Sequence, residues 1–225
     1  MSARSTPGAV AFAIDLDDLA ARLALANPED TCKGMFFNGL FRAVVRQGGT
    51  PASDTLRHVG RGQKFVDFFN YPIADFLPMA WHAAAVAGGG SDSTALERGI
   101  RSLGRQATDD FLSTAVGKTL LMLAGSDPRR LMASLASGYK TAVSYGVRAL
   151  EWKGRMVSEA SAGGPHGNSQ TRCLFTMRRD FMPHPYHEGV LLQVLTTVGA
   201  RGVQVKGTRV GLLDTDYEVS WEAKP

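Results

Sequence analysis

The sequence predicts an α+β fold, with an N-terminal helical layer packed on a C-terminal four-stranded antiparallel sheet of order β-β-α-β-β. Up to about residue 145, apolar residues recur at helical spacing. From about residue 148 they alternate in short runs, broken by a single helical segment. Because helices and strands are segregated along the chain rather than alternating, the pattern favours α+β over a parallel α/β sheet.

Composition sets the outer limits of this interpretation. The chain has 225 residues, 44% of them hydrophobic and 20% charged, which is typical of a globular domain. We expect a flexible N-terminal arm over residues 1–14 and a single domain over residues 15–222. The net charge of +4 comes from dispersed arginines, so nucleic-acid binding is not expected. Two cysteines cannot form a disulfide framework, which favours the cytoplasm, and no apolar run is long enough for a membrane span.

Three helical segments are predicted in the first part of the domain. Residues 15–26 carry an apolar stripe behind acidic residues that suit a helix start. Residues 34–47 are apolar nearly all round and end at Gly48 and Gly49. Residues 67–88 are strongly apolar, and we expect their helix to start or kink at Pro72 or Pro78.

Two further helices precede the strands. One of Ser91, Asp92 and Ser93 can cap a helix whose period continues from Leu96 to residue 111 and on towards residue 123. Gly125 is typical of a helix end, and Pro128 of a fresh start. The next helix is expected over residues 131–145.

The remaining elements form the sheet. Strands are predicted over residues 148–160 and 171–179, joined by a hairpin loop over 161–169. A helix over residues 186–199 follows. Two more strands are expected around residues 203–207 and 217–221, with Tyr217, Val219 and Trp221 on one face.

Catalytic motifs are incomplete in this sequence. Gly117-Lys118-Thr119 resembles the end of a phosphate-binding loop, but the glycine required five residues earlier is replaced by Leu112. Cys32, near Asp30 and Lys33, is a candidate reactive thiol without an identifiable base. We therefore expect a protein that is not an enzyme and has no catalytic residues.

Histidines leave one cofactor alternative open. His82 lies in an apolar helical segment beside Trp81, and His184 and His187 flank Pro185 at a helix start. Each could ligate haem or a metal. The more economical interpretation is a hydrogen-bonded core histidine and helix-start residues, so the sequence predicts no metal site and no cofactor.

Several segments together resemble a paralogous family of uncharacterised proteins expanded in myxobacteria, a domain of unknown function. They include YHEGV at residues 186–190, YEVSW at 217–221, and residues 30–40, 69–77, 97–104, 111–118 and 127–145. More remotely, the order of elements is similar to the ligand-binding fold of haem-nitric-oxide sensors, 4-vinyl-reductase-like sensors and Bet3-type transport subunits. That resemblance implies a pocket between helices and sheet, and a homodimer.

The chain departs from the metal-binding members of this group. The haem sensors place their axial histidine on the helix before the first strand, and the matching residues 131–146 contain no histidine. Their Tyr-x-Ser-x-Arg motif is also absent. The vinyl-reductase-like sensors use a cysteine-rich site near the last strands, whereas no cysteine follows Cys173.

The leading functional hypothesis is a cytoplasmic sensory or regulatory protein that binds an apolar small molecule. The expected ligand-binding residues are the large apolar side chains Phe37, Phe41, Phe69, Phe76, Trp81, Tyr139 and Trp152. One alternative is an adaptor that works through homodimer and signalling-partner contacts without a ligand. A haem or metal sensor is the other.

Overall fold

The computed structural model describes residues 13–145, 151–161 and 169–222. Within these ranges the chain is α+β, as the sequence predicts. Its helices are α1 (Leu16–Leu25), α2 (Gly34–Val59), α3 (Ile73–Gly88), α4 (Ser93–Leu112), α5 (Ala115–Ala124), α6 (Pro128–Ala142) and α7 (His184–Thr197). Residues 162–168 of the expected hairpin loop (161–169) and residues 1–12 of the expected arm (1–14) lie outside the described residues.

The C-terminal sheet is the four-stranded antiparallel sheet expected from the alternating segments. It has the order β4-β5-β7-β6, and its strands are β4 (Glu151–Ser161), β5 (Ser169–Arg178), β7 (Thr215–Glu222) and β6 (Gln204–Arg209). Alternate residues of its two central strands are buried: Cys173, Phe175 and Met177 on β5, with Tyr217, Val219 and Trp221 on β7. These are the faces that the alternation indicated.

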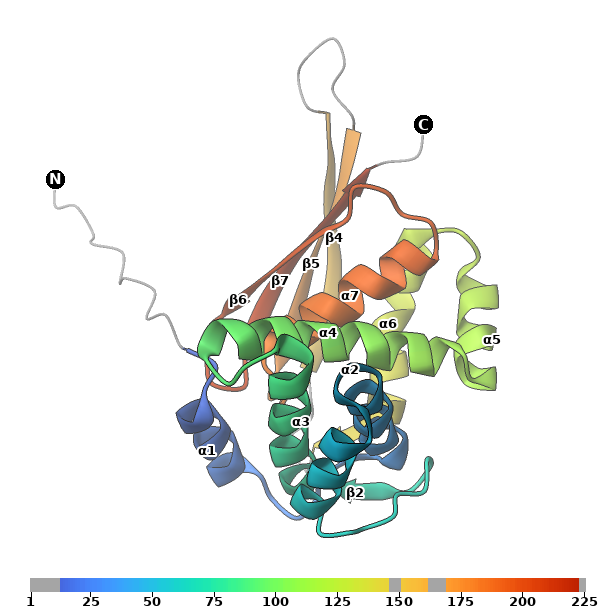
Figure 1. The fold of residues 1–225 in the computed structure, drawn as a ribbon. Coiled ribbons are helices and arrows are strands. Elements are labelled where there is room, and N and C mark those ends of the chain that lie inside the picture. The colour runs from blue at the N-terminus through green and yellow to red at the C-terminus, as the bar shows by residue number, and fades with distance from the viewer. Residues whose placement is uncertain (1–12, 146–150, 162–168, 223–225) are drawn as a thin grey trace, which may run out of the picture.

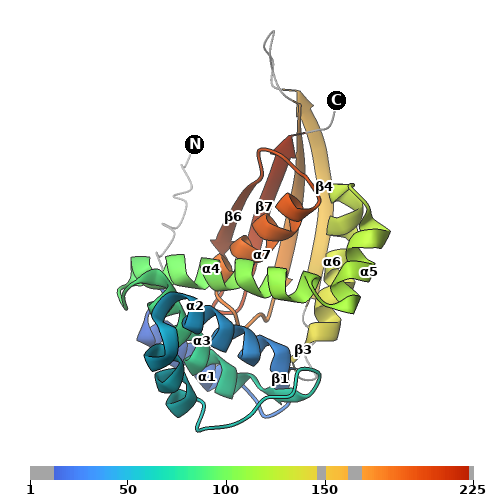
Figure 2. The ribbon, with the colours of Figure 1, turned by 45° about the vertical axis from the view of Figure 1, so that its right-hand side comes forward.

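The layers are arranged around α4. Figure 1 shows α7 lying against the four-stranded sheet and α4 crossing α7, with α1, α2 and α3 below. Figure 2 shows α5 and α6 beside β4, at the edge of the sheet. The core is continuous across these layers, because Phe37, Ile100 and Phe175 all belong to one buried cluster.

The crossing of α4 and α7 depends on two glycines. A Cβ at Gly104 would lie 1.9 Å from the Tyr186 carbonyl oxygen, and one at Gly189 would lie 2.1 Å from the Arg101 carbonyl oxygen. The two backbones can therefore approach this closely only because neither position carries a side chain. This contact joins the helical layer to the helix that covers the sheet.

A second, three-stranded sheet was not expected from the sequence. It has the order β2-β1-β3, with strands β1 (Asp30–Lys33), β2 (Asn70–Pro72) and β3 (Val143–Tyr145). The last strand corrects the prediction that the preceding helix reaches residue 145. Strands of three or four residues show too few alternations to be recognised by period.

Two helix boundaries also differ from expectation. Gly49 has a φ of 66°, which breaks the helical path where an end was expected, but α2 resumes with Pro51 and continues to Val59. The helix expected to run on towards residue 123 instead stops at Leu112, and Thr114 caps α5 by accepting from the Gly117 N–H at 3.1 Å. Asp92 and Gly125 occupy the capping positions that were predicted.

Candidate functional site

An aromatic cluster forms around Phe37, near the start of α2, and includes two of the expected ligand-binding residues. Phe37 is fully buried, and its ring centroid lies 5.0 Å from that of Phe76 in an edge-to-face contact. On its other side Phe37 stacks on Phe65, with centroids 4.1 Å apart and planes 16° apart. Tyr71 completes the cluster at 5.6 Å from Phe37. These four rings therefore pack against one another.

The other expected ligand-binding residues are dispersed. Phe41 is half-buried, and the Arg57 guanidinium lies 5.5 Å from its ring centroid. Trp81 is buried, and its indole N–H donates to the Asp15 carbonyl oxygen at 3.0 Å, which ties α3 to the start of α1. Phe69 is 64% exposed, so its side chain lies at the surface and not in the interior. The side chains of Tyr139 and Trp152 lie outside the described residues.

A small cleft lies where α2, α3 and α4 meet α7. Its lining is Phe36, Gly39, Leu40, Phe76, Leu103, Gln106, Ala107 and Tyr186, and its volume is about 10 Å³. That volume is about enough for one water molecule. The lining residues with a polar group are Tyr186, through its hydroxyl, and Gln106, whose amide nitrogen donates to the Asp110 carboxylate at 2.8 Å. The cleft is therefore an apolar opening between the helical layer and α7.

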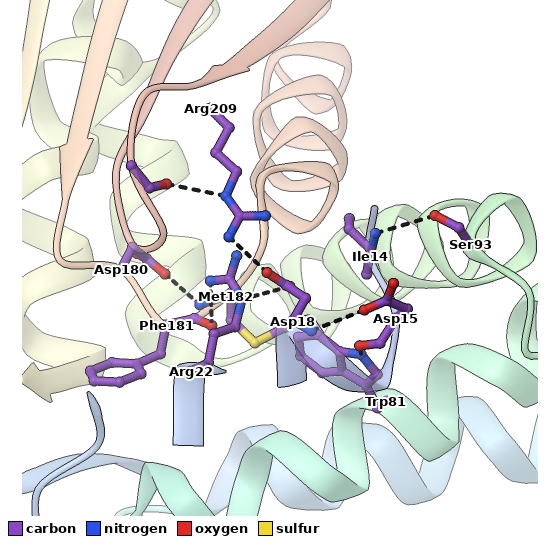
Figure 3. Close-up of polar contacts among 11 residues, drawn as sticks. Ile14, Asp15, Asp18, Arg22, Trp81, Ser93, Asp180, Phe181, Met182 and Arg209 are labelled. Atoms are coloured by element: carbon purple, nitrogen blue, oxygen red, sulfur yellow. Dashed lines mark hydrogen bonds and ion pairs between the residues drawn. The ribbon is translucent and has the colours of Figure 1, made fainter. Parts of the chain in front are cut away.

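A buried ion-pair network, formed by Asp18, Arg22 and Arg209, joins the first helix to the C-terminal part of the chain (Figure 3). The Arg22 Nε lies 2.8 Å from Asp18 Oδ2, and the Arg209 Nη2 lies 2.8 Å from Asp18 Oδ1. The side chains of Asp18 and Arg22 are each only 3% exposed. The two guanidiniums share the Asp18 carboxylate, and the negative charge of Asp180 also favours the cationic form of Arg22. Buried charges are tolerated when they are paired in this way.

The network ties α1 to the connection between β5 and α7. Arg22 donates to the Phe181 carbonyl oxygen at 3.1 Å. The Asp180 carboxylate accepts from the Met182 N–H at 2.8 Å and lies 3.0 Å from His187 Nε2. Burial lowers the pKa of Arg22, and the neighbouring Asp18 opposes that shift. Because the arginine guanidinium is always charged in proteins, Arg22 needs the opposite charge of Asp18 beside it in this buried position.

The sequence carries one local signal for this network. Asp18 and Arg22 stand four residues apart on α1, the spacing at which an acid and a base pair on a helix. The acidic residues at this helix start were interpreted through the helix dipole alone, so the pair was not predicted. Arg209 carries no comparable local signal, since its partner Asp18 lies far away in the sequence.

The two helix-start histidines have different surroundings. His187 is fully buried beside Asp180, while His184 is half-buried in the first turn of α7. Burial lowers the pKa of His184, and the carboxylates of Glu188 and Glu97 act in the opposite direction. Among the described residues, no three His, Cys, Asp or Glu side chains are placed to hold a metal ion together.

Two other candidate motifs have structural roles. Cys32 is 2% exposed on β1, and burial raises the pKa of its thiol, so the expectation of a reactive cysteine is wrong for the folded state. Gly117-Lys118-Thr119 lies within α5 rather than in a loop after a strand. A Cβ at Gly117 would lie 2.2 Å from the Phe111 carbonyl oxygen, so this glycine permits the tight connection between α4 and α5.

The sequence matches the model of the family described as "Protein of unknown function (DUF2378)" over residues 25–162 and 165–222. The chain belongs to the DUF2378 family. No protein in the curated set matches its sequence. No described helix is long and apolar enough to cross a membrane.

Solved structures similar to this DUF2378 member are H-NOX proteins. An H-NOX protein from S. oneidensis in the Fe(II)NO ligation state has a TM-score of 0.61 and 12% identity, covering 85% of this chain and 99% of that one. An oxygen-binding H-NOX domain related to soluble guanylate cyclases has a TM-score of 0.58 and 11% identity, covering 84% and 94%. An Fe(II) unliganded H-NOX protein from K. algicida has a TM-score of 0.58 and 8% identity, covering 85% and 97%. The shared property is the fold, as the remote resemblance in element order predicted.

Proposed function

We propose that this DUF2378 protein is a non-enzymatic sensory or regulatory protein that binds an apolar small molecule between its helical layer and α7, the helix that covers the sheet. The observation that carries the proposal is the position of the cleft, which opens where α2, α3 and α4 meet α7. The fold supports it, because the similar H-NOX structures, in the words that describe them, include Fe(II)NO and oxygen complexes. Fold likeness alone would be only an analogy.

The lining of the cleft determines the chemical class of ligand. Phe36, Phe76, Leu103 and Tyr186 offer apolar and aromatic surface. Their neighbour Gln106 already bonds Asp110. A ligand larger than water therefore gains affinity mainly from apolar contact. It would enter by displacing half-buried lining side chains such as Phe36 and Gln106, which solvent already reaches.

Haem does not fit the described residues. The helix before the C-terminal sheet, α6, contains no histidine. His187 bonds Asp180 in a fully buried position, and the cleft of about 10 Å³ is far too small for a porphyrin. His82 lies on α3 with its Nε2 shielded from solvent and without a hydrogen-bond partner among the described residues. No step of the proposed function passes through haem or a metal.

Native mass spectrometry of the full chain tests this proposal. Protein incubated with an organic extract of cells should retain an added mass that disappears on denaturation. Ala107→Trp, which fills the cleft, should abolish the added mass, whereas Ala115→Trp on the exposed start of α5 should retain it. An unliganded wild-type protein, or equal retention by both variants, would overturn the proposal.

A second candidate, an adaptor without a ligand, is favoured by the outer face of α5. Val116, Met122 and Leu123 are 59%, 76% and 72% exposed on this helix. Apolar side chains concentrated on one short helix are typical of a protein contact. The adaptor hypothesis predicts that M122S/L123S disrupts a homodimer or a partner complex, measured by light scattering after gel filtration. A monomeric wild-type protein whose partner complexes tolerate the double substitution would contradict it.

A further inference from the structure

Three apolar side chains protrude from the segment between α2 and β2. Val66 is 52% exposed, Phe68 72% and Phe69 64%; we call these three residues the aromatic knuckle. In Figures 1 and 2 this segment lies at the lower edge of the molecule, at the end opposite the β4–β5 hairpin. Three exposed apolar side chains within four residues, two of them phenylalanines, are costly in water, and exposed apolar patches mark contact sites.

The backbone of the aromatic knuckle is held by the start of α2. The Gly34 N–H donates to the Phe69 carbonyl oxygen at 2.9 Å, and the Met35 N–H donates to the Asp67 carbonyl oxygen at 3.0 Å. A Cβ at Gly34 would lie 2.2 Å from the Val66 carbonyl oxygen. The segment therefore packs directly on the helix start, with the carbonyls of Asp67 and Phe69 directed toward it.

Side chains of α2 and β2 also form hydrogen bonds with the same segment. Asn38 Nδ2 donates to the Phe65 carbonyl oxygen at 3.0 Å and to the Asp67 carboxylate at 2.7 Å. The Tyr71 hydroxyl accepts from the Val66 N–H at 2.9 Å. Phe65 itself stacks on buried Phe37. Because Phe65 occupies the inner position, Phe68 and Phe69 cannot turn into the core without breaking these bonds. Their exposure is built into the fold.

Three cationic residues belong to the aromatic knuckle's surroundings, one by a hydrogen bond and two by their place in the same segment. The Lys33 ammonium donates to the Phe68 carbonyl oxygen at 3.1 Å, and Arg61 and Lys64 are exposed on the same segment. The one nearby carboxylate within the segment, that of Asp67, already accepts from Asn38. The surface therefore combines protruding apolar side chains with an excess of positive charge.

We propose that the aromatic knuckle is a membrane-docking element that inserts Val66, Phe68 and Phe69 into the headgroup region of an anionic lipid surface. Apolar and aromatic side chains bind at that depth, and lysine and arginine gain from anionic lipid within about a Debye length. A second copy is a poorer occupant. A two-fold contact through this patch would bring Lys33, Arg61 and Lys64 against the same cations of its partner.

Co-sedimentation with vesicles tests the proposal on the full chain. The probes are vesicles of phosphatidylcholine alone and vesicles containing about 30% phosphatidylserine. The wild-type protein should sediment with the anionic vesicles, and less as salt is raised. F68S/F69S should weaken binding at least tenfold, and K64E several-fold. M122S/L123S, which removes an equally exposed apolar pair elsewhere, should bind as wild type does.

The outcomes of this experiment distinguish an anionic lipid surface from a second copy of the chain as the partner of the aromatic knuckle. Absence of binding to anionic vesicles, or equal binding by F68S/F69S and wild type at equal thermal stability, overturns the proposal. Conversion of a wild-type dimer to a monomer by F68S/F69S, without vesicle binding, assigns the patch to a second copy and also overturns it. Since the ligand experiment uses Ala107 in the cleft, either proposal can fail without the other.

Discussion

Asp18 on α1 and Arg209 at the end of β6 form an ion pair, with 2.8 Å between the carboxylate and the guanidinium, although they lie near opposite ends of the chain. Arg22 bonds the other oxygen of the same carboxylate. Asp18 is thus shared by two arginines, one from its own helix and one from the sheet. The first helix is held to the C-terminal sheet by charge as well as by apolar contact.

Asp18→Asn should be strongly destabilising, because it leaves Arg22 and Arg209 buried without their shared carboxylate. Removing one partner of a buried pair costs about 3–5 kcal/mol. We expect a loss of this order in the free energy of unfolding, measured by urea denaturation. Asp17→Asn is the matched control, since Asp17 occupies the same helical turn but is exposed, and it should leave the midpoint nearly unchanged.

A double-mutant cycle tests whether the loss of stability comes from the Asp18–Arg209 ion pair or from independent effects of the two substitutions. If the ion pair carries the cost, D18N combined with Arg209→Gln should destabilise by clearly less than the sum of the two single substitutions. Additive losses would show that Asp18 and Arg209 act independently and that the ion pair does not carry the stability of this contact.

Much of the fold followed from the sequence where the signal was local. Helical period and the caps at Asp92 and Gly125 located the helices, and alternation assigned the buried faces of β5 and β7. The three-stranded sheet did not follow, because it pairs segments near residues 30, 70 and 143 that share no local pattern. The Asp18–Arg209 pair was missed for the same reason.

The expected binding residues illustrate a second limit of sequence reasoning. Phe37 and Phe76 meet in the core because each lies on the inner stripe of its helix. Phe69 belongs to the same apolar stretch of sequence, but it precedes the helix, and its carbonyl oxygen accepts from the Gly34 N–H. That bond fixes the backbone in an orientation that leaves the ring exposed. Hydrophobicity alone indicated burial, whereas the side chain is at the surface.

The glycine contact between α4 and α7 predicts opposite effects for two glycine substitutions. At Gly104 a methyl group would lie 1.9 Å from the Tyr186 carbonyl oxygen, so Gly104→Ala should lower the free energy of unfolding by ~1–3 kcal/mol or more. At Gly39, in α2, the nearest atoms would lie at 3.5 Å and 3.7 Å, an ordinary contact. Gly39→Ala should therefore stabilise by ~0.5–1 kcal/mol through helix propensity. Thermal denaturation compares the two; equal effects would contradict the close approach.

His184 predicts a pH dependence of stability. Burial lowers its pKa in the folded state below the ordinary value of 6.5, so on acidification the unfolded chain takes up a proton first. Stability from this group is fully present above about pH 6.5 and is lost as pH falls below that value. Urea denaturation between pH 7.5 and 5.5 should show a shallower decline for His184→Gln than for wild type. His58→Gln, at an exposed position on α2, should keep the wild-type slope; identical slopes for all three proteins would refute the prediction.

Both cysteines should be unreactive until the chain opens. Cys32 and Cys173 are 2% and 1% exposed, and burial raises the pKa of the Cys32 thiol, which removes the reactive thiolate. We expect Ellman's reagent at pH 8 to label the native protein about a hundredfold or more slowly than the urea-unfolded chain, with a rate set by opening of the structure. The single variants Cys32→Ser and Cys173→Ser assign the rate to each thiol. Fast labelling of Cys32 in the native protein would mean that β1 opens without global unfolding, and that the packing of the three-stranded sheet does not persist in solution.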